Sequence, residues 1–154
     1  MLPRPVFDYR REYEFTIPAA EVWAGIERVD QFESWWPWLQ EFRVDGSPLG
    51  VGSVLHGVVV PPLPYRMRLR VELTRYERPE GIDAVVTGDL EGEATLRVRS
   101  HGTWSMVEVA WTVEMKQRPM RLASRFGRPL LQWGHDRVVE ITVAGFRRRL
   151  ESAG

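Results

Sequence analysis

The period of the apolar residues changes once along this chain, and that change limits the folds open to it. From residue 40 to residue 115 apolar and polar side chains alternate, a pattern typical of strands that bury one face. The clearest strand reads YRMRLRVELTRY, in which every second side chain from Tyr65 to Leu73 is apolar. Turns that contain glycine or proline separate the strands at hairpin spacing. The pattern predicts an antiparallel sheet with one buried and one solvated face.

After Pro119 the apolar residues recur at helical spacing to the end of the chain, which predicts one long helix over roughly residues 120–151. Pro129 is expected to break or kink this helix. On a helical wheel the apolar residues form one broad stripe that also holds a histidine and a threonine. The stripe contains Leu131, His135, Val138, Val139, Thr142, Phe146 and Leu150.

The N-terminal part of the chain adds a further strand and two short helices. The strand is expected over residues 6–16, where aromatic and charged side chains alternate. The helices are expected near residues 18–29 and 30–36, and Pro37 ends the second one. The order of strand, two short helices, about six strands and one long helix indicates a single α+β domain over residues 1–154. A curved antiparallel sheet that grips such a helix leaves a space between them.

The charges of the chain balance, with 21 basic and 21 acidic residues, so the basic excess of nucleic-acid-binding proteins is missing. The same balance gives no attraction to anionic membranes. The sequence begins without a signal peptide, and it has no run of about 18 apolar residues that could span a bilayer. We therefore expect a cytoplasmic protein without stable membrane insertion. A single lysine and no asparagine, both of which have AT-rich codons, indicate a GC-rich bacterial genome.

The residue types of metal and cofactor sites are also sparse. The absence of cysteine excludes disulfides, thiolate metal sites and cysteine nucleophiles. No two histidines have the spacing of metal ligands, and neither an HExxH nor a GxSxG motif occurs. The glycines of GSPLGVGS lie between predicted strands, with no helix after them to hold a phosphate. We therefore expect neither a metal nor a cofactor.

Five stretches carry a resemblance that covers almost the whole chain. They read IPAAEVWAGIERVDQFESWW, LPYRMRLRV, GDLEG, VAWTVEM and RPLLQWGHDRVV. In this order and spacing they resemble the START-like, Bet v 1-like (SRPBCC) superfamily, and within it the polyketide cyclase/dehydrase-like proteins. The resemblance implies a helix-grip fold, in which a curved antiparallel sheet of about seven strands wraps around a long C-terminal helix. It also implies a deep apolar cavity between them, which in this superfamily usually holds a small hydrophobic or aromatic molecule.

Three of the seven tryptophans fall within FESWWPWLQEF, residues 32–42. In the helix-grip fold this segment closes one end of the sheet, so Trp35 and Trp38 are expected to line the cavity and Trp36 to cap the core. Each ring can bury on the order of 200 Å². The alternative is that all three rings are ordinary core packing between the short helices and the sheet.

His135 is the most informative polar residue, because it lies inside the apolar stripe of the last helix. A neutral imidazole there could hydrogen-bond a ligand or act as a general base. Asp136 and Glu140 are expected to point elsewhere, so burial should keep the ring neutral. A His135→Phe change is then expected to weaken binding with little loss of stability. The alternative is a core histidine that bonds a backbone carbonyl. Gly134 and Gly145 flank the stripe and would leave room beside the sheet.

The other candidate groups lie on the strands. His56 shares a strand face with two valines and is a second polar candidate for the cavity. Arg66, Arg68 and Arg70 are expected on the outer, solvated face, paired with carboxylates. The full set of expected ligand contacts is Trp35, Trp38, His56, Tyr65, Met67, Leu69, Trp111, Leu131, His135, Val138 and Thr142.

Three functions remain open. The first is binding of a small hydrophobic or aromatic molecule in the cavity. The second is an enzyme of the polyketide cyclase/aromatase or dehydratase type that uses the same cavity, although no residue matches a characterised cyclase motif and no catalytic residue is assigned. The third is an interaction module whose cavity is filled by side chains. The protein could be a monomer or a homodimer.

Overall fold

The strands form one antiparallel sheet in the computed structural model, which describes residues 6–46, 48–116 and 127–151. Seven strands within these ranges pair in the order β1-β7-β6-β5-β4-β3-β2. Apart from β1 and β7, each strand pairs with its neighbour in sequence, as the hairpin turns predict. The strands are β1 (Val6–Phe15), β2 (Leu39–Asp45), β3 (Val54–Val59), β4 (Met67–Glu77), β5 (Gly81–Gly88), β6 (Leu90–His101) and β7 (Trp104–Met115).

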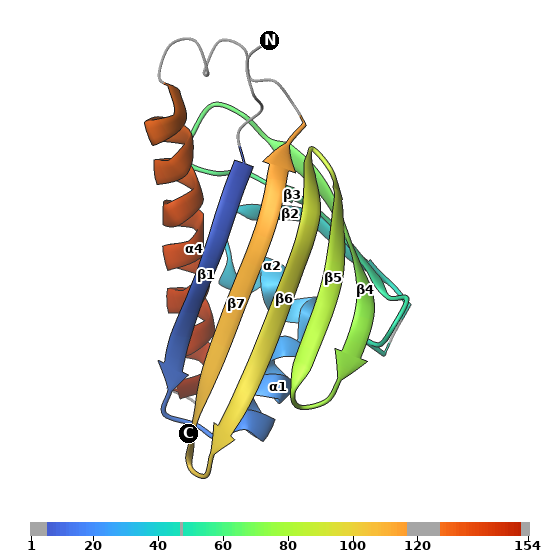
Figure 1. The fold of residues 1–154 in the computed structure, drawn as a ribbon, viewed down its shortest axis with the longest axis vertical. Helices are drawn as coiled ribbons and strands as arrows, with labels where there is room; N and C mark the ends of the chain where they lie inside the picture. The colour runs from blue at the N-terminus through green and yellow to red at the C-terminus, as the bar shows by residue number, and fades with distance from the viewer. Residues whose placement is uncertain (1–5, 47, 117–126, 152–154) are drawn as a thin grey trace.

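The helices all lie on one side of the curved sheet, and the longest of them, α4 (Gly127–Glu151), runs beside β1 (Figure 1). The helix-grip architecture expected from the sequence is therefore confirmed. The stretch 120–126, also expected to be helical, lies outside the described residues. Pro129 does not break the described helix. It lies in the first turn of the described helix. Backbone N–H groups in a first turn have no carbonyl acceptor within the helix, so a proline there costs no hydrogen bond.

The two short helices are shorter than the sequence predicts. α1 (Ala19–Ile26) begins after Pro18, and a 3-10 turn (Val29–Gln31) leads into α2 (Phe32–Trp35). The chain then turns through Pro37 into β2. The predicted helices are a few residues too long, because the sequence pattern at a helix end is less distinct than the apolar pattern along its face.

The two faces of the sheet divide as the alternation predicts. The outer face carries ion pairs such as Arg70–Glu72 at 3.2 Å and Arg10–Glu108 at 3.1 Å. Arg66 and Arg68 both approach Glu41 on β2, at 3.4 and 3.7 Å. The inner face packs against the helices. It contributes Phe7, Phe15, Met67, Leu73, Val86, Val98, Val107, Val113 and Met115 to the core.

No helix within the described ranges is long and apolar enough to cross a bilayer.

Candidate functional site

An apolar pocket of about 350 Å³ lies between the inner face of the sheet and α4. Its wall is almost entirely hydrocarbon, and its volume lies within the range of small-molecule sites. The strands supply the wall because their inward side chains alternate with the charged outer ones. The lining residues are Phe7, Trp38, Val59, Pro61, Tyr65, Met67, Leu69, Val71, Val86, Leu90, Ala94, Val109, Trp111, Val113, His135, Val138, Val139, Thr142 and Val143.

Eight of the eleven expected contacts line this pocket: Trp38, Tyr65, Met67, Leu69, Trp111, His135, Val138 and Thr142. Several further lining residues, which were not among the expected contacts, lie on the same alternating strand faces. Val71 continues the alternation of β4, and Val109 and Val113 flank Trp111 on β7. The alternation could therefore have identified them. Val86 could not have been found this way, because the apolar residues of β5 do not alternate cleanly.

Trp35 does not line the pocket, contrary to the expectation. It is 5% exposed and packs edge-on against Phe146 of α4 and beside Phe32. Trp36 is also core, as expected, and its indole Nε1 donates to the Thr142 carbonyl at 3.0 Å. Pro37 follows the helical turn, and Trp38, whose ring stacks on that of Trp36, reaches the pocket. The segment therefore joins the short helices to α4 through two rings and lines the pocket with the third.

His56 was assigned to the wrong face of the sheet. It does share a face with Val54 and Val58, but that face is the outer one, because His56 lies opposite the outward Arg70. Its Nε2 is 3.0 Å from the Asp45 carboxylate. The apolar neighbours, which are buried, suggested an inward face, but the strand register places Val59 of the opposite face beside Met67 in the pocket wall.

Leu131 was also expected in the pocket and lies beside it instead. It is 1% exposed and packs into the core with Phe7, Met67 and Met115. The pocket begins one helical turn later, at His135. Leu131 therefore supports the wall without lining it.

His135 is held by two partners at the edge of the pocket. The Trp111 indole Nε1 donates to His135 Nε2 at 3.0 Å, and His135 Nδ1 lies 3.0 Å from the Asp136 carboxylate. An indole N–H can only donate, so Nε2 must accept and Nδ1 must carry the ring proton. The imidazole is therefore neutral, and it stacks on Phe7 with ring centroids 5.0 Å apart.

The expectation that Asp136 points away from His135 was wrong. The two residues are adjacent on the helix, and the Asp136 carboxylate folds back to accept from His135 and from Gln132, the latter at 2.9 Å. Burial opposes ionisation of Asp136, but these hydrogen bonds outweigh it and lower its pKa. The carboxylate therefore stays ionised at neutral pH and holds the imidazole tautomer in place.

The remaining polar side chains of the pocket offer little acid–base chemistry. The Thr142 hydroxyl donates to the Val138 carbonyl of its own helix at 2.7 Å. Burial raises the pKa of Tyr65 to about 12, so its phenol stays protonated. Trp38 differs from these groups. Within the described residues its Nε1 is the one buried side-chain nitrogen or oxygen without a hydrogen-bond partner.

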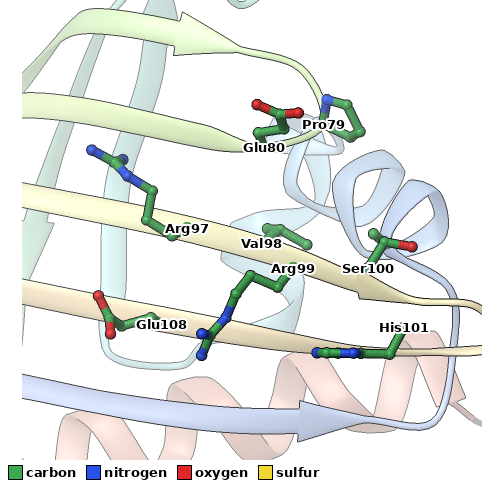
Figure 2. Close-up of a pocket in the computed structure, with 9 residues that line it drawn as sticks. Pro79, Glu80, Arg97, Val98, Arg99, Ser100, His101 and Glu108 are labelled. Carbon is green, nitrogen blue, oxygen red and sulfur yellow. The ribbon is translucent and has the colours of Figure 1, made fainter.

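A wider depression of about 670 Å³ lies on the outer face, beside β6 (Figure 2). Arginines extend from the strand into it, but each is already paired. Arg97 lies 2.6 Å from Asp83, and Arg99 lies 2.9 Å from Glu12. Glu108 is paired with Arg10. Because its arginines and Glu108 are already paired, this depression is a weaker candidate than the apolar pocket.

The side chains of the described residues offer no group of three histidines or carboxylates that could hold a metal ion.

The sheet, the gripped helix and the pocket between them define a helix-grip protein of the START-like, Bet v 1-like superfamily. Residues 16–132 match the family described as "Polyketide cyclase / dehydrase and lipid transport". The chain belongs to this family. No sequence among the curated proteins matches it.

Solved structures agree with this fold. A protein from Thermus thermophilus superposes with a TM-score of 0.78 at 18% identity, covering 96% of this chain and 99% of that one. The Zhui aromatase/cyclase from a Streptomyces species gives 0.71 at 12% identity, covering 97% and 99%. A START superfamily protein from Mycobacterium smegmatis gives 0.71 at 13%, covering 96% and 99%. At such identities the likeness concerns the fold alone.

Proposed function

We propose that this protein binds a small apolar or aromatic molecule in the pocket between the sheet and α4. The observation that carries the proposal is the character of the wall, which is almost entirely hydrocarbon although the pocket has the volume of a small-molecule site. Burial of apolar ligand surface would supply the binding free energy, at about 25 cal/mol per Å² removed from water. An open apolar pocket also counts against a filled, purely structural interaction module.

A cyclase- or dehydratase-type reaction is the alternative that family membership keeps open. Such chemistry needs a general base or acid within hydrogen-bond reach of the substrate. His135 is the pocket's natural base, but its Nε2 accepts from Trp111 and its Nδ1 donates to Asp136. Tyr65 stays protonated because burial raises its pKa to about 12. With the candidate base occupied, binding is the function that the geometry supports better.

Titration with N-phenyl-1-naphthylamine, a neutral fluorescent apolar probe, tests the proposal. Ala94 faces the pocket, and Ala110 lies on the outer face of β7, next to the pocket residue Trp111. An Ala94→Phe change should fill the pocket and weaken binding by about tenfold or more. The matched Ala110→Phe change should leave binding unchanged.

The proposal fails if the wild-type protein does not bind the probe, or if the two phenylalanine variants bind it equally well. Both variants should first show the wild-type circular dichroism spectrum, because an added ring in a packed site can cost about 1–3 kcal/mol.

A further inference from the structure

A polar groove lies next to the apolar pocket, between β1 and α4, the two elements that run side by side in Figure 1. The groove has a volume of about 740 Å³, and Val139 and Val143 of α4 border both spaces. β1 is an edge strand, so within the described ranges no further strand covers this side of the pocket. A ligand that passed between these two valines would place its polar end in the groove.

Arg11 places a positive charge at the junction of the two spaces. It lies on the inner face of β1, opposite Val109, which itself lines the pocket. Its neighbours on that face are Tyr9 and Tyr13, whose hydroxyl oxygens are 2.5 Å apart. An arginine among inward aromatic residues interrupts the apolar face at the point where the groove begins.

The other basic groups of the groove already have anionic partners. Arg10 pairs with Glu108 at 3.1 Å, and Arg147 pairs with Glu151 at 3.1 Å. Arg11 has no carboxylate within 4.0 Å among the residues that the structure describes. Its nearest polar neighbours are the hydroxyl groups of Tyr13 and Tyr9.

The acidic groups of the groove are occupied in the same way. Asp136 accepts from His135 and Gln132, and Glu140 lies 3.1 Å from Arg137. Asp8 accepts from the Thr112 hydroxyl at 3.0 Å. The charge left for a ligand is therefore the positive one on Arg11, with a pair of mutually hydrogen-bonded phenol hydroxyls beside it that has one O–H left to donate.

We propose that the groove is a head-group subsite and that the ligand is an amphipathic carboxylate, with its apolar part in the pocket and its carboxylate at Arg11, Tyr9 and Tyr13. This inference rests on the proposed function, because it assigns the polar end of the molecule that the pocket binds. A carboxylate accepts from both a guanidinium and phenol hydroxyls, and charge-assisted hydrogen bonds are roughly twice as strong as neutral ones. Tyr9 stays protonated, since burial and the hydrogen bond to Tyr13 raise its pKa to about 12.

A structural role for Arg11 is the competing explanation. An inward-pointing charge on an edge strand can prevent that strand from pairing with another chain. In that role Arg11 would affect self-association and not the choice of ligand head group. The two explanations therefore make different predictions for the same variant.

Displacement of N-phenyl-1-naphthylamine by decanoate and by 1-decanol tests the subsite, because the two competitors share a chain and differ in charge. At neutral pH and low salt, the wild-type protein should prefer decanoate by about two- to fivefold, the range of one exposed charged contact. Arg11→Gln should remove the preference without weakening decanol binding, and Arg11→Lys should restore most of it. Arg70→Gln, on the outer face of β4 and outside the groove, should keep the full preference.

Equal displacement by the two competitors in the wild-type protein would overturn the subsite while leaving the pocket proposal intact. A preference that survives in Arg11→Gln, especially with increased self-association by sedimentation, would assign Arg11 the edge-protecting role instead. Failure of the probe itself to bind would sink the proposed function and the subsite together.

Discussion

At the scale of single residues, the stacked indoles of Trp36 and Trp38 differ in one respect that stability can measure. Their ring centroids are 5.6 Å apart, but Trp36 donates to the Thr142 carbonyl and the Trp38 N–H has no partner. A buried donor without a partner costs about 1–3 kcal/mol. Both rings therefore bury apolar surface, but only the Trp36 indole also makes a hydrogen bond.

We expect Trp36→Phe to lower the free energy of unfolding by about 1–3 kcal/mol more than Trp38→Phe. Both changes remove an indole ring, but the first loses the hydrogen bond to the Thr142 carbonyl and the second removes an unpaired donor. Urea denaturation of the two variants measures the difference. Equal losses would show that the Trp38 N–H is satisfied in solution, for example by water.

The structure also changes the expected effect of replacing His135. The sequence suggested that His135→Phe would cost little stability. Because His135 Nε2 accepts from Trp111, that change leaves an indole N–H unpaired and should cost about 1–3 kcal/mol. The double variant with Trp111→Phe should cost less than the sum of the two single changes, which a double-mutant cycle by urea denaturation measures. Additive losses would mean that the Trp111–His135 bond contributes nothing.

At the scale of elements, the glycines of α4 mark close contacts with loops and not with the sheet. A Cβ at Gly145 would lie 3.0 Å from the Trp35 carbonyl oxygen and 3.2 Å from Trp36 Cδ1. A Cβ at Gly134 would lie 2.4 Å from Leu63 Cδ1, the tip of a flexible side chain in the segment after β3. The expected room beside the sheet is thus room for the tryptophan segment and for Leu63.

Gly145→Ala should therefore destabilise the protein, and Gly134→Ala should be nearly neutral. Each change gains roughly 1 kcal/mol of helix propensity. At position 145 the new methyl group presses against backbone, which cannot move aside cheaply, while at 134 the Leu63 tip can change rotamer. Thermal unfolding of the two variants gives the comparison. A more stable Gly145→Ala variant would mean that the tryptophan segment packs less tightly on α4.

At the scale of the whole molecule, Glu151 ties the end of α4 to the turn that follows β1. Its carboxylate accepts from the side chain and backbone of Thr16 and lies 3.1 Å from Arg147. Burial raises the pKa of Glu151, but these hydrogen bonds and Arg147 outweigh burial, so the net shift is downward. Because the pKa of Glu151 is lower in the folded state, its ionised carboxylate stabilises the fold at pH values above the usual glutamate pKa of 4.5. This contribution disappears as the pH falls through the lowered pKa.

We expect Glu151→Gln to lower the free energy of unfolding by about 1 kcal/mol at neutral pH. The difference from wild type should shrink as the pH falls below the usual glutamate value, because the wild-type carboxylate is then protonated too. Glu140→Gln is the matched control, since Glu140 pairs only with the exposed Arg137 on the same helix. Urea denaturation as a function of pH measures both. A difference that persists unchanged into acid would assign the effect to packing.

The sequence by itself determined the order of the elements and much of the pocket wall. Alternation and helical spacing are local properties, because the residues of one strand or helix face recur at a fixed spacing within one continuous segment. They were sufficient to place Tyr65, Met67 and Leu69 on one face of β4 and His135 on the inner face of α4. The same local signals placed the outer arginines on the solvated face, but they did not give the carboxylate partners, since Arg66 and Arg68 approach Glu41 of β2.

Only the tertiary structure decided which face of β3 meets the pocket, which tryptophan reaches the pocket, and where each polar group finds its partner. His56 follows the register between β3 and β4, and Trp38 follows the turn at Pro37. The Trp111–His135 bond joins residues from a strand and a helix. Register, turn direction and contacts between distant segments depend on how the elements pack against one another, and residue spacing within one element carries no information about them.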